Sequence, residues 1–297
     1  MKTAVVFAAP LLALAAAGSG RASNIIDRNA HNVRLAVNRD GQALVSYTVR
    51  GREMHVMAWG AIDARQPTRR RAQVSFRMDY SGRSWTSFTN QCRAYDGPVL
   101  AFRVAACSAP DGSYWALQSW RRTLPNFDGR PRAGLGSWEL HLSHWRGPTA
   151  ILEAWTDWVY GGRYHHLFGR LRYEGQPVYG FSASRAGSPT DGYGRNIYVD
   201  TFDSRYGKGW RRENAFLAHR PTGVFCYGFY AFTKRGPGNG AKYRLTVIGP
   251  GVTPDVSLVV PGLHDYDRNN AADVANERQQ NALLDSIRGA DKKCRAH

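Results

Sequence analysis

The fold is decided by residues 33–49, which read Val33-Arg34-Leu35-Ala36-Val37, then Asn38-Arg39-Asp40-Gly41-Gln42, then Ala43-Leu44-Val45-Ser46-Tyr47-Thr48-Val49. Apolar side chains recur at every second position on both sides of Asp40-Gly41, and this alternation is typical of a strand with one buried face. An Asp-Gly pair between two such runs predicts a tight β-hairpin. Arg50-Gly51 predicts a second turn, and residues 54–59 then form a third expected strand.

The same pattern continues along most of the chain, punctuated by 31 glycines and 14 prolines. Further strands are predicted at residues 73–79, 98–106, 114–121, 137–145, 150–159, 167–173, 177–182, 196–202, 223–232, 242–249 and 256–260. Many short strands separated by turn residues predict an all-β fold of β-sandwich or jelly-roll type.

The number of β units is left open by the sequence. Residues 124–136 are rich in proline and glycine and are the best candidate for a linker. We therefore expect an N-terminal β unit at residues 23–128, a C-terminal β unit at residues 129–266, and a helix with a tail at residues 267–297. The candidate linker equally fits a long loop within one sandwich, so one or two β units are compatible with the chain length.

The first 22 residues have the features of a signal peptide. Lys2 precedes an apolar stretch from Ala4 to Ala17, and small residues allow cleavage after Ala17 or Ala22. The stretch is too short to span a bilayer, which takes roughly 20 apolar residues, and no later stretch approaches that length. We expect a secreted protein, extracellular or associated with the cell wall, without a transmembrane segment.

The net charge bears on the partners of such a protein. Removal of residues 1–22 takes away Lys2 and Arg21 and no acidic residue, so the formal charge falls from +17 to +15. A protein this basic is attracted to polyanions such as extracellular polysaccharide. The sequence has no zinc-finger spacing, basic-region heptad or RRM signature, so we expect no specific nucleic-acid partner. The oligomeric state is left open.

Four cysteines predict two disulfides in an exported chain. Of the three possible pairings we favour Cys92 with Cys107 and Cys226 with Cys294. The second bridge would hold the end of the chain, where residues 270–288 carry the spacing of an α-helix, against the β body. Asp267, Asn269 or Asn270 are candidates for the helix cap, and Gly289 for its end.

A polar strand face supplies the candidate catalytic residues. If residues 137–145 and 150–159 form a hairpin around Gly147–Thr149, successive side chains alternate between the two faces of the sheet. One face then carries the following residues, with Glu139 opposite Asp157: Glu139, His141, Ser143, Glu153, Trp155 and Asp157. Trp138, Leu140 and Leu142 would lie on the core side.

Three roles are compatible with these strands. Two carboxyl groups about 5 Å apart, one with a raised pKa, suit a retaining glycosidase, with Glu139 and Asp157 as the acid pair and His141 or Glu153 assisting. The other reading is a solvated strand face with arginines beside the acids. Stacking of a sugar on Trp145 or Trp155 is a third, non-catalytic possibility.

A second candidate region spans the loops and the strand at residues 191–214. Its tyrosines and tryptophan could stack on a ligand while arginine binds a carboxylate or sulfate, which makes Tyr193, Arg195, Tyr206 and Trp210 candidate ligand-binding residues. The alternative is a turn-rich connection with internal Arg–Asp pairs.

The sequence predicts no cofactor. Asp265, Asp267 and Asn269 resemble the opening of a calcium loop, but Asn270 stands in place of the usual glycine and Asn276 in place of the final glutamate. A helix cap explains the same residues. No other metal site is expected.

Three stretches give the chain a family resemblance: Trp115–Trp120, Trp138–Trp145 and Tyr193–Asp200. On these it resembles uncharacterised secreted proteins of GC-rich Gram-positive bacteria, and the resemblance implies export without implying an activity. The sequence favours an extracellular protein that binds a glycan or anionic polymer. The alternatives are a glycan-acting hydrolase or lyase with paired carboxylates, and a structural envelope protein without a ligand site.

Overall fold

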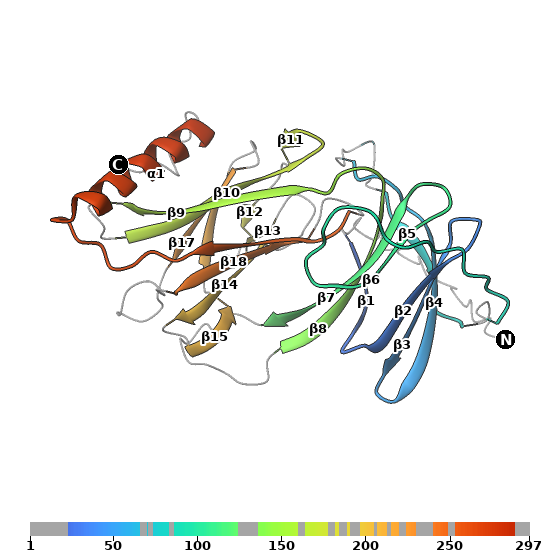
Figure 1. Cartoon of the computed structure of the whole chain (residues 1–297). Helices are drawn as coiled ribbons and strands as arrows, with labels where there is room; N and C mark the ends of the chain where they lie inside the picture. Colours follow the sequence, from blue (N-terminus) through green and yellow to red (C-terminus); the bar gives the residue numbers. More distant parts are fainter. Residues whose placement is uncertain are drawn as a thin grey trace, which may run out of the picture.

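The structure, a computed structural model, consists mainly of antiparallel β-sheet with one α-helix near the C-terminal end (Figure 1). It describes residues 23–65, 70, 74–82, 86–123, 136–159, 164–177, 182–183, 189–190, 197–204, 207–212, 215–219, 224–229, 240–248 and 253–288. The prediction of a β-rich chain with a C-terminal helix is therefore confirmed.

Two four-stranded sheets are built from the N-terminal half of the chain. Sheet I has the strand order β1-β8-β7-β6, and its strands are β1 (Asn24–Arg28), β6 (Arg103–Ser108), β7 (Tyr114–Thr123) and β8 (Gly136–Trp145). Sheet II has the order β2-β3-β4-β5, with β2 (His31–Val37), β3 (Ala43–Val49), β4 (Arg52–Gly60) and β5 (Phe76–Asp79).

Sheets I and II share one cluster of buried apolar side chains. It includes Val45 and Val56 of sheet II and Trp115, Leu117 and Leu142 of sheet I, all fully buried. The alternation read at residues 33–49 explains the contribution of sheet II, since every second residue of β3 lies in this cluster. Burial of these side chains is the main favourable term that holds the two sheets together.

Two further sheets follow along the chain. Sheet III has the order β11-β10-β17-β16, with β9 also paired to β10, and its strands are β9 (Ile151–Val159), β10 (Tyr164–Tyr173), β11 (Gln176–Pro177), β16 (Ala215–His219) and β17 (Val224–Phe229). Sheet IV has the order β15-β14-β18-β19, with β14 (Ile197–Ser204), β15 (Gly207–Arg212), β18 (Lys242–Val247) and β19 (Val256–Pro261). Strands β12 (Ser182–Ala183) and β13 (Pro189–Thr190) form a two-stranded pair.

A second buried cluster joins sheets III and IV. Leu167 and Leu171 of β10 lie in it together with Tyr243, Leu245 and Val247 of β18. Odd-numbered residues of β18 therefore face sheet III, and the even-numbered residues lie on the opposite face of sheet IV, where Thr246 is also buried.

The turn chemistry read from the sequence is confirmed. Gly41 has a φ of 71°, and the Asn38 side chain accepts hydrogen bonds from the backbone nitrogens of Asp40 and Gln42. The Arg50-Gly51 and Glu174-Gly175 turns have positive φ at both residues, as tight hairpins with two-residue loops require.

Some strands were not predicted. Strands β1, β15 and β16 carry no long apolar alternation, and the strand expected at residues 98–106 begins five residues later, at Arg103. Strand β1 forms its ladder with β8 around a bulge between Ile25 and Asp27, so distant pairing and not local pattern determines it.

Helix α1 (Ala271–Arg288) begins where the cap residues predict. The side-chain oxygen of Asn270 accepts a hydrogen bond from the Ala272 nitrogen, so Asn270 is the N-cap. The segment before the helix packs on β9, where the ring of Trp158 contacts His264 and Tyr266. Among the described residues no helix is long and apolar enough to cross a membrane.

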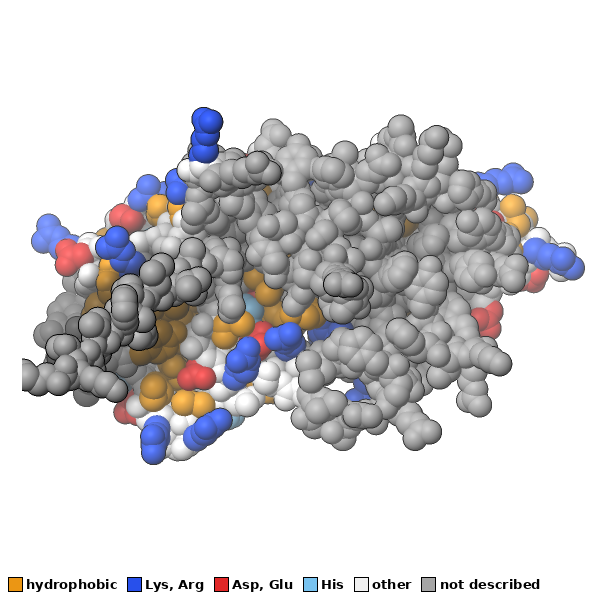
Figure 2. Space-filling view, turned by 180° about the vertical axis from the view of Figure 1, so that it is seen from behind, with side chains coloured by type: hydrophobic (Ala, Val, Ile, Leu, Met, Phe, Trp, Pro, Cys, Tyr) orange, Lys and Arg blue, Asp and Glu red, His pale blue; other side chains and the backbone are white. Residues whose placement is uncertain are grey.

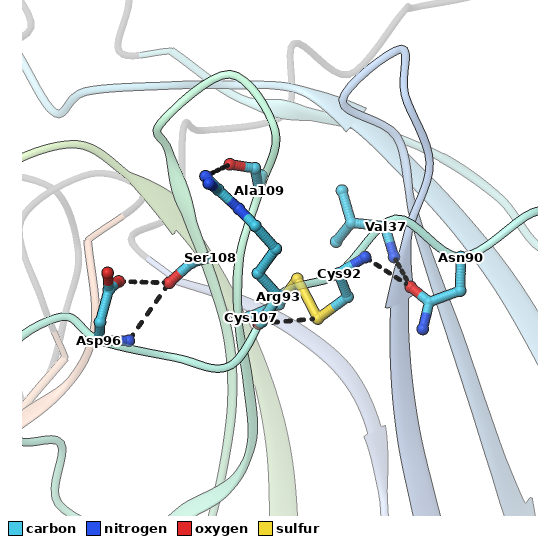
Figure 3. The surroundings of a disulfide bond; sticks show 8 residues. All are labelled: Val37, Asn90, Cys92, Arg93, Asp96, Cys107, Ser108 and Ala109. Carbon is cyan, nitrogen blue, oxygen red and sulfur yellow. Dashed lines mark hydrogen bonds between the residues drawn. A yellow bond between two sulfur atoms is a disulfide. The ribbon is translucent and has the colours of Figure 1, made fainter.

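One disulfide joins Cys92 to Cys107 of β6, with a Cα–Cα distance of 5.4 Å (Figure 3). Beside it, the Asn90 side chain accepts hydrogen bonds from the nitrogens of Val37 and Cys92, which ties the loop to β2. This predicted pair is confirmed, and it does not lie at the helix. The bridge from Cys226 to Cys294 falls outside the described residues, because Cys294 follows the last of them.

The predicted boundary at residues 128/129 separates strands of one sheet. Strand β8 lies after it but pairs with β7 along its whole length and with β1. Residues 124–135 lie outside the described residues, and the number of β units stays a prediction.

Candidate functional site

The hairpin on which the catalytic prediction depended is wrong. Strand β8 pairs with β7 and β1 in sheet I, whereas β9 pairs with β10 in sheet III. The connection between them is bound to loops that follow β4 and β6: the Arg146 nitrogen donates to Asp63, and the Arg146 guanidinium to Asp111. Glu139 and Asp157 therefore stand on strands of different sheets, and the side chain of Asp157 is not among those described.

The alternation along β8 was predicted correctly, but its polar face is not solvated. Glu139, His141 and Ser143 share that face and are at most 1 % exposed. Leu140 and Leu142, on the other face, are buried in the core of sheets I and II. Trp138, which was predicted to lie on the core side, is 52 % exposed.

His141 lies between two carboxylates. Its Nδ1 is 3.1 Å from Asp255, just before β19, and its Nε2 is 3.3 Å from Glu139. Asp255 also accepts hydrogen bonds from Ser23 and from the indole nitrogen of Trp120, at 2.6 and 2.9 Å. Burial alone would lower the pKa of His141, but the charges and hydrogen bonds of Asp255 and Glu139 raise it to about 9. The ring is therefore a cation that donates to both acids.

Two arginines complete the surroundings of Glu139. Arg28 and Arg122 contact its Oε1 at 3.2 and 3.3 Å. Burial would raise the pKa of Glu139, but His141 and Arg122 outweigh it and lower the pKa to about 2. This shift is opposite to the raised pKa expected for a general acid. The cluster of Glu139, His141 and Asp255 can hold sheet I to the residue that precedes β19. Its buried carboxylates stay ionised at neutral pH.

The other predicted residues of the β9 face form a local ion pair. Glu153 pairs with Arg170 and with Arg172, and these contacts lower the pKa of Glu153. The Trp155 ring packs against Phe168 with centroids 5.6 Å apart, and the Arg170 guanidinium lies 6.0 Å from the Trp155 ring centroid. This is the alternative in which arginines lie beside the acid.

Trp145 cannot provide an exposed platform. It is fully buried beside Tyr95 and Tyr114, so its prediction as a surface stacking residue is wrong. An aromatic side chain that buries its whole surface contributes to packing in preference to recognition.

Trp210 lies on β15, partly exposed, on the face of sheet IV that faces away from sheet III. The guanidinium of Arg244 sits 4.5 Å from its ring centroid, and Phe202 packs edge-on at 5.2 Å. Arg244 pairs with Asp200 at 2.9 Å, and so does Arg212. Tyr193, Arg195 and Tyr206, predicted with Trp210, lie outside the described residues.

This face continues onto sheet I. Arg212 lies 4.2 Å from the ring centroid of Tyr198, and Arg122 of sheet I lies 5.9 Å from the same ring. Tyr198 also contacts Trp120, and Arg244 lies over Phe102. We call this set the junction strip: Phe102, Arg122, Tyr198, Asp200, Phe202, Trp210, Arg212 and Arg244. Figure 2 shows Lys and Arg side chains beside hydrophobic and acidic ones near the middle of the face seen from behind.

A periodic signal could have identified this strip. Trp210 and Arg212 stand at alternate positions, as do Lys242 and Arg244, so each pair shares one face of its strand. Trp210 was predicted from the sequence but Arg212 and Arg244 were not, because the pairing of β14 with β15 and β18 that brings them together is not local.

Within the described parts of the chain, no group of three or more His, Cys, Asp or Glu side chains is arranged so that it could hold a metal ion. At the calcium-like segment, Asp267 accepts from the Asn269 nitrogen, and Asp273 accepts from the Asp267 nitrogen and contacts His264. These oxygens organise the start of α1, and calcium binding by Asp265, Asp267 and Asn269 stays untested.

No family model, no curated protein sequence and no solved structure matches the chain.

Proposed function

We propose that the chain is an exported protein that binds an anionic polysaccharide, or a chemically related anionic polymer, on the junction strip. The observation that carries the proposal is the position of Arg244. Its guanidinium lies 4.5 Å from the Trp210 ring centroid, 5.6 Å from that of Phe102 and 2.9 Å from Asp200. A cation is thus held in place beside a partly exposed indole.

The chemistry of the face suits an acidic sugar. An indole face packs against the C–H groups of a sugar ring, and a guanidinium binds a carboxylate or sulfate through two parallel hydrogen bonds. Among the described residues, the face of sheet IV that carries Trp210 has three basic side chains, those of Arg212, Lys242 and Arg244, against one acid, Asp200. Arg212 and Asp200 are buried as an ion pair, so the accessible positive charge comes from Lys242 and Arg244. This excess of positive charge favours an anionic ligand over a neutral one.

Two further features support the proposal. The signal-like segment at residues 1–22 supports export, and the remaining charge of +15 attracts polyanions outside the cell. The paired sheets, I with II and III with IV, each bury a common apolar cluster, which supports a β-sandwich for each pair. A rigid sheet is a precise support for a binding surface.

The test is a binding panel of immobilised neutral, uronate-rich and sulfated polysaccharides with the protein from Ser23 to His297. Arg244→Gln is expected to weaken binding to the acidic polymers by about tenfold or more, since a hydrogen bond between charged groups contributes roughly 1.5–3 kcal/mol. The matched control is Arg52→Gln, which removes an exposed charge from β4 of sheet II.

The two variants separate a site from general attraction. Both lower the net charge by one, so binding by charge alone would weaken equally in both and would disappear at high salt. Equal losses, or binding to none of the polymers, would contradict the proposal. Trp210→Phe, which keeps an aromatic face, is expected to bind more tightly than Trp210→Ala.

A further inference from the structure

Trp138 is the most exposed tryptophan among the residues that the structure describes, with 52 % of its surface accessible. It lies near the start of β8, two positions before the first core residue of that strand, Leu140. A large indole left in solvent gives up the free energy that its burial would provide, roughly 1.5–3 kcal/mol for a large apolar side chain. The exposed ring is therefore available to a ligand.

The backbone that carries this ring is held from the neighbouring strand. The Asn29 nitrogen donates to the Trp138 carbonyl at 2.7 Å, and the Trp138 nitrogen donates to the Asn29 side chain at 3.0 Å. Asn29 adopts a φ of 54°, an unusual conformation for a residue other than glycine, and makes both bonds. Because tryptophan has only two side-chain torsions, a fixed backbone leaves the indole little freedom to lose on binding.

An arginine lies beside the ring. Arg121 of β7 is directly opposite Trp138 in the antiparallel ladder, so the two side chains share one face of sheet I, about 5 Å apart at Cβ. Arg121 is exposed. A Cβ added at Gly136 would lie only 2.7 Å from the Arg121 Nε, so the guanidino group lies over the bare backbone of Gly136. Because Gly136 has no side chain, the Arg121 guanidino group has room to lie against the backbone of β8.

We propose that Trp138 and Arg121 form a second binding site for an acidic sugar residue, with the indole face against the ring and the guanidinium on its carboxylate or sulfate. The inference rests on the proposed function, since it assigns the same ligand class. Trp138 and Arg121 alternate with Glu139 and Arg122, so this site lies on the face of sheet I opposite to the junction strip. A protein with sites on two faces binds two polymer chains and crosslinks them.

Isothermal titration with two pure probes, a hexamer of galacturonic acid and a sulfated heparin hexasaccharide, tests the inference on the protein from Ser23 to His297. The wild type is expected to bind two oligosaccharides per chain, and Trp138→Ala and Trp210→Ala one each. Gly136→Ala displaces Arg121 while the indole stays, and is expected to weaken binding at this site about tenfold. Trp138→Phe is expected to retain two sites.

Crosslinking gives an independent readout. Long galacturonate chains mixed with the wild type are expected to turn turbid, and either tryptophan-to-alanine variant is expected to abolish the turbidity. Both variants should keep the wild-type circular dichroism spectrum, because Trp138 is exposed and Trp210 is partly exposed.

The outcomes distinguish a failure of the Trp138 site from a failure of the junction strip. A wild type with one site that is lost in Trp210→Ala and kept in Trp138→Ala overturns the second site and leaves the proposed function standing. One site lost only in Trp138→Ala overturns the junction strip and supports Trp138. The absence of binding to both probes overturns both.

Discussion

Replacing His141 by glutamine removes a buried cation from between Glu139 and Asp255, and the surrounding distances set the size of the effect. His141 is fully buried, 3.1 Å from Asp255 and 3.3 Å from Glu139. Breaking a buried charge pair by removing one partner costs about 3–5 kcal/mol, because the remaining carboxylates stay buried without their counter-ion. We expect the free energy of unfolding of His141→Gln near neutral pH to fall by that amount.

The direction in which the free energy of unfolding changes with pH distinguishes this charged cluster from apolar packing. The pKa of His141 rises from 6.5 to about 9 on folding. The stability from this shift is fully present below 6.5 and is lost as the pH rises through 9, a decline of about 3 kcal/mol at 1.36 kcal/mol for each pKa unit. The pKa of Glu139 falls from 4.5 to about 2, so its contribution is present above 4.5 and is lost as the pH falls through 2. The two shifts describe one shared contact and are not added.

The assay is urea denaturation of the wild type and of His141→Gln across this range of pH. The wild type is expected to lose stability between 6.5 and 9, and the variant to lack that decline, so that the two curves converge at high pH. Because the variant is weakened, an NMR titration of the His141 ring in the wild type provides a second measurement. Parallel stability curves, or a ring that titrates at its ordinary pKa near 6.5, would refute the reasoning.

Three other experiments test the fold. Cys92→Ser with Cys107→Ser opens a loop with a sequence separation of 15 and should lower the free energy of unfolding by about 3 kcal/mol, measured against the wild type with and without reductant. Leu142→Ala should cost about 2–5 kcal/mol in the same assay, because Leu142 is fully buried, whereas Val259→Ala at a half-exposed position should change little. Asn270→Ala removes the cap of α1 and should cost about 1 kcal/mol, and an unchanged thermal midpoint would show that the cap is not needed.

The parts of the fold that the sequence predicted are those fixed by local chemistry. The hairpin around Asp40-Gly41 needs only an alternating pattern and a residue that accepts positive φ, and both are visible in residues 33–49. The start of α1 at Asn270 is likewise decided by residues within one turn of it. The Cys92–Cys107 pair is close in sequence and encloses a single loop.

The candidate site could not be predicted in the same way, because its contacts join distant segments. Glu139 and His141 have the alternation of a solvated face, but Ser23, which lies 118 residues before His141, and Asp255 cover them. A strand buried on both faces no longer shows which of its faces is wet. The choice of β7 over β9 as the partner of β8 depends on long-range packing, and the same holds for the meeting of Trp210 with Arg244.

Trp138 and Trp145 show the same limit within one strand. They lie on opposite faces of β8: Trp138, on the face of Leu140 and Leu142, is exposed, whereas Trp145, on the face of Glu139 and His141, is fully buried, so the local pattern predicts the wrong exposure for both. The exposure of each indole is determined by the segments that pack over its end of sheet I.

The most direct test of ligand binding at the junction strip is hydrogen exchange measured with and without an acidic oligosaccharide. Strand β15 forms the edge of sheet IV and carries Trp210, so its amides exchange readily and report on a ligand that covers this face. We expect slower hydrogen exchange in β15 and β18 on addition of a galacturonate or heparin hexasaccharide, and unchanged exchange in β4 of sheet II. Exchange in β15 and β18 that is unaffected by saturating oligosaccharide would contradict this expectation.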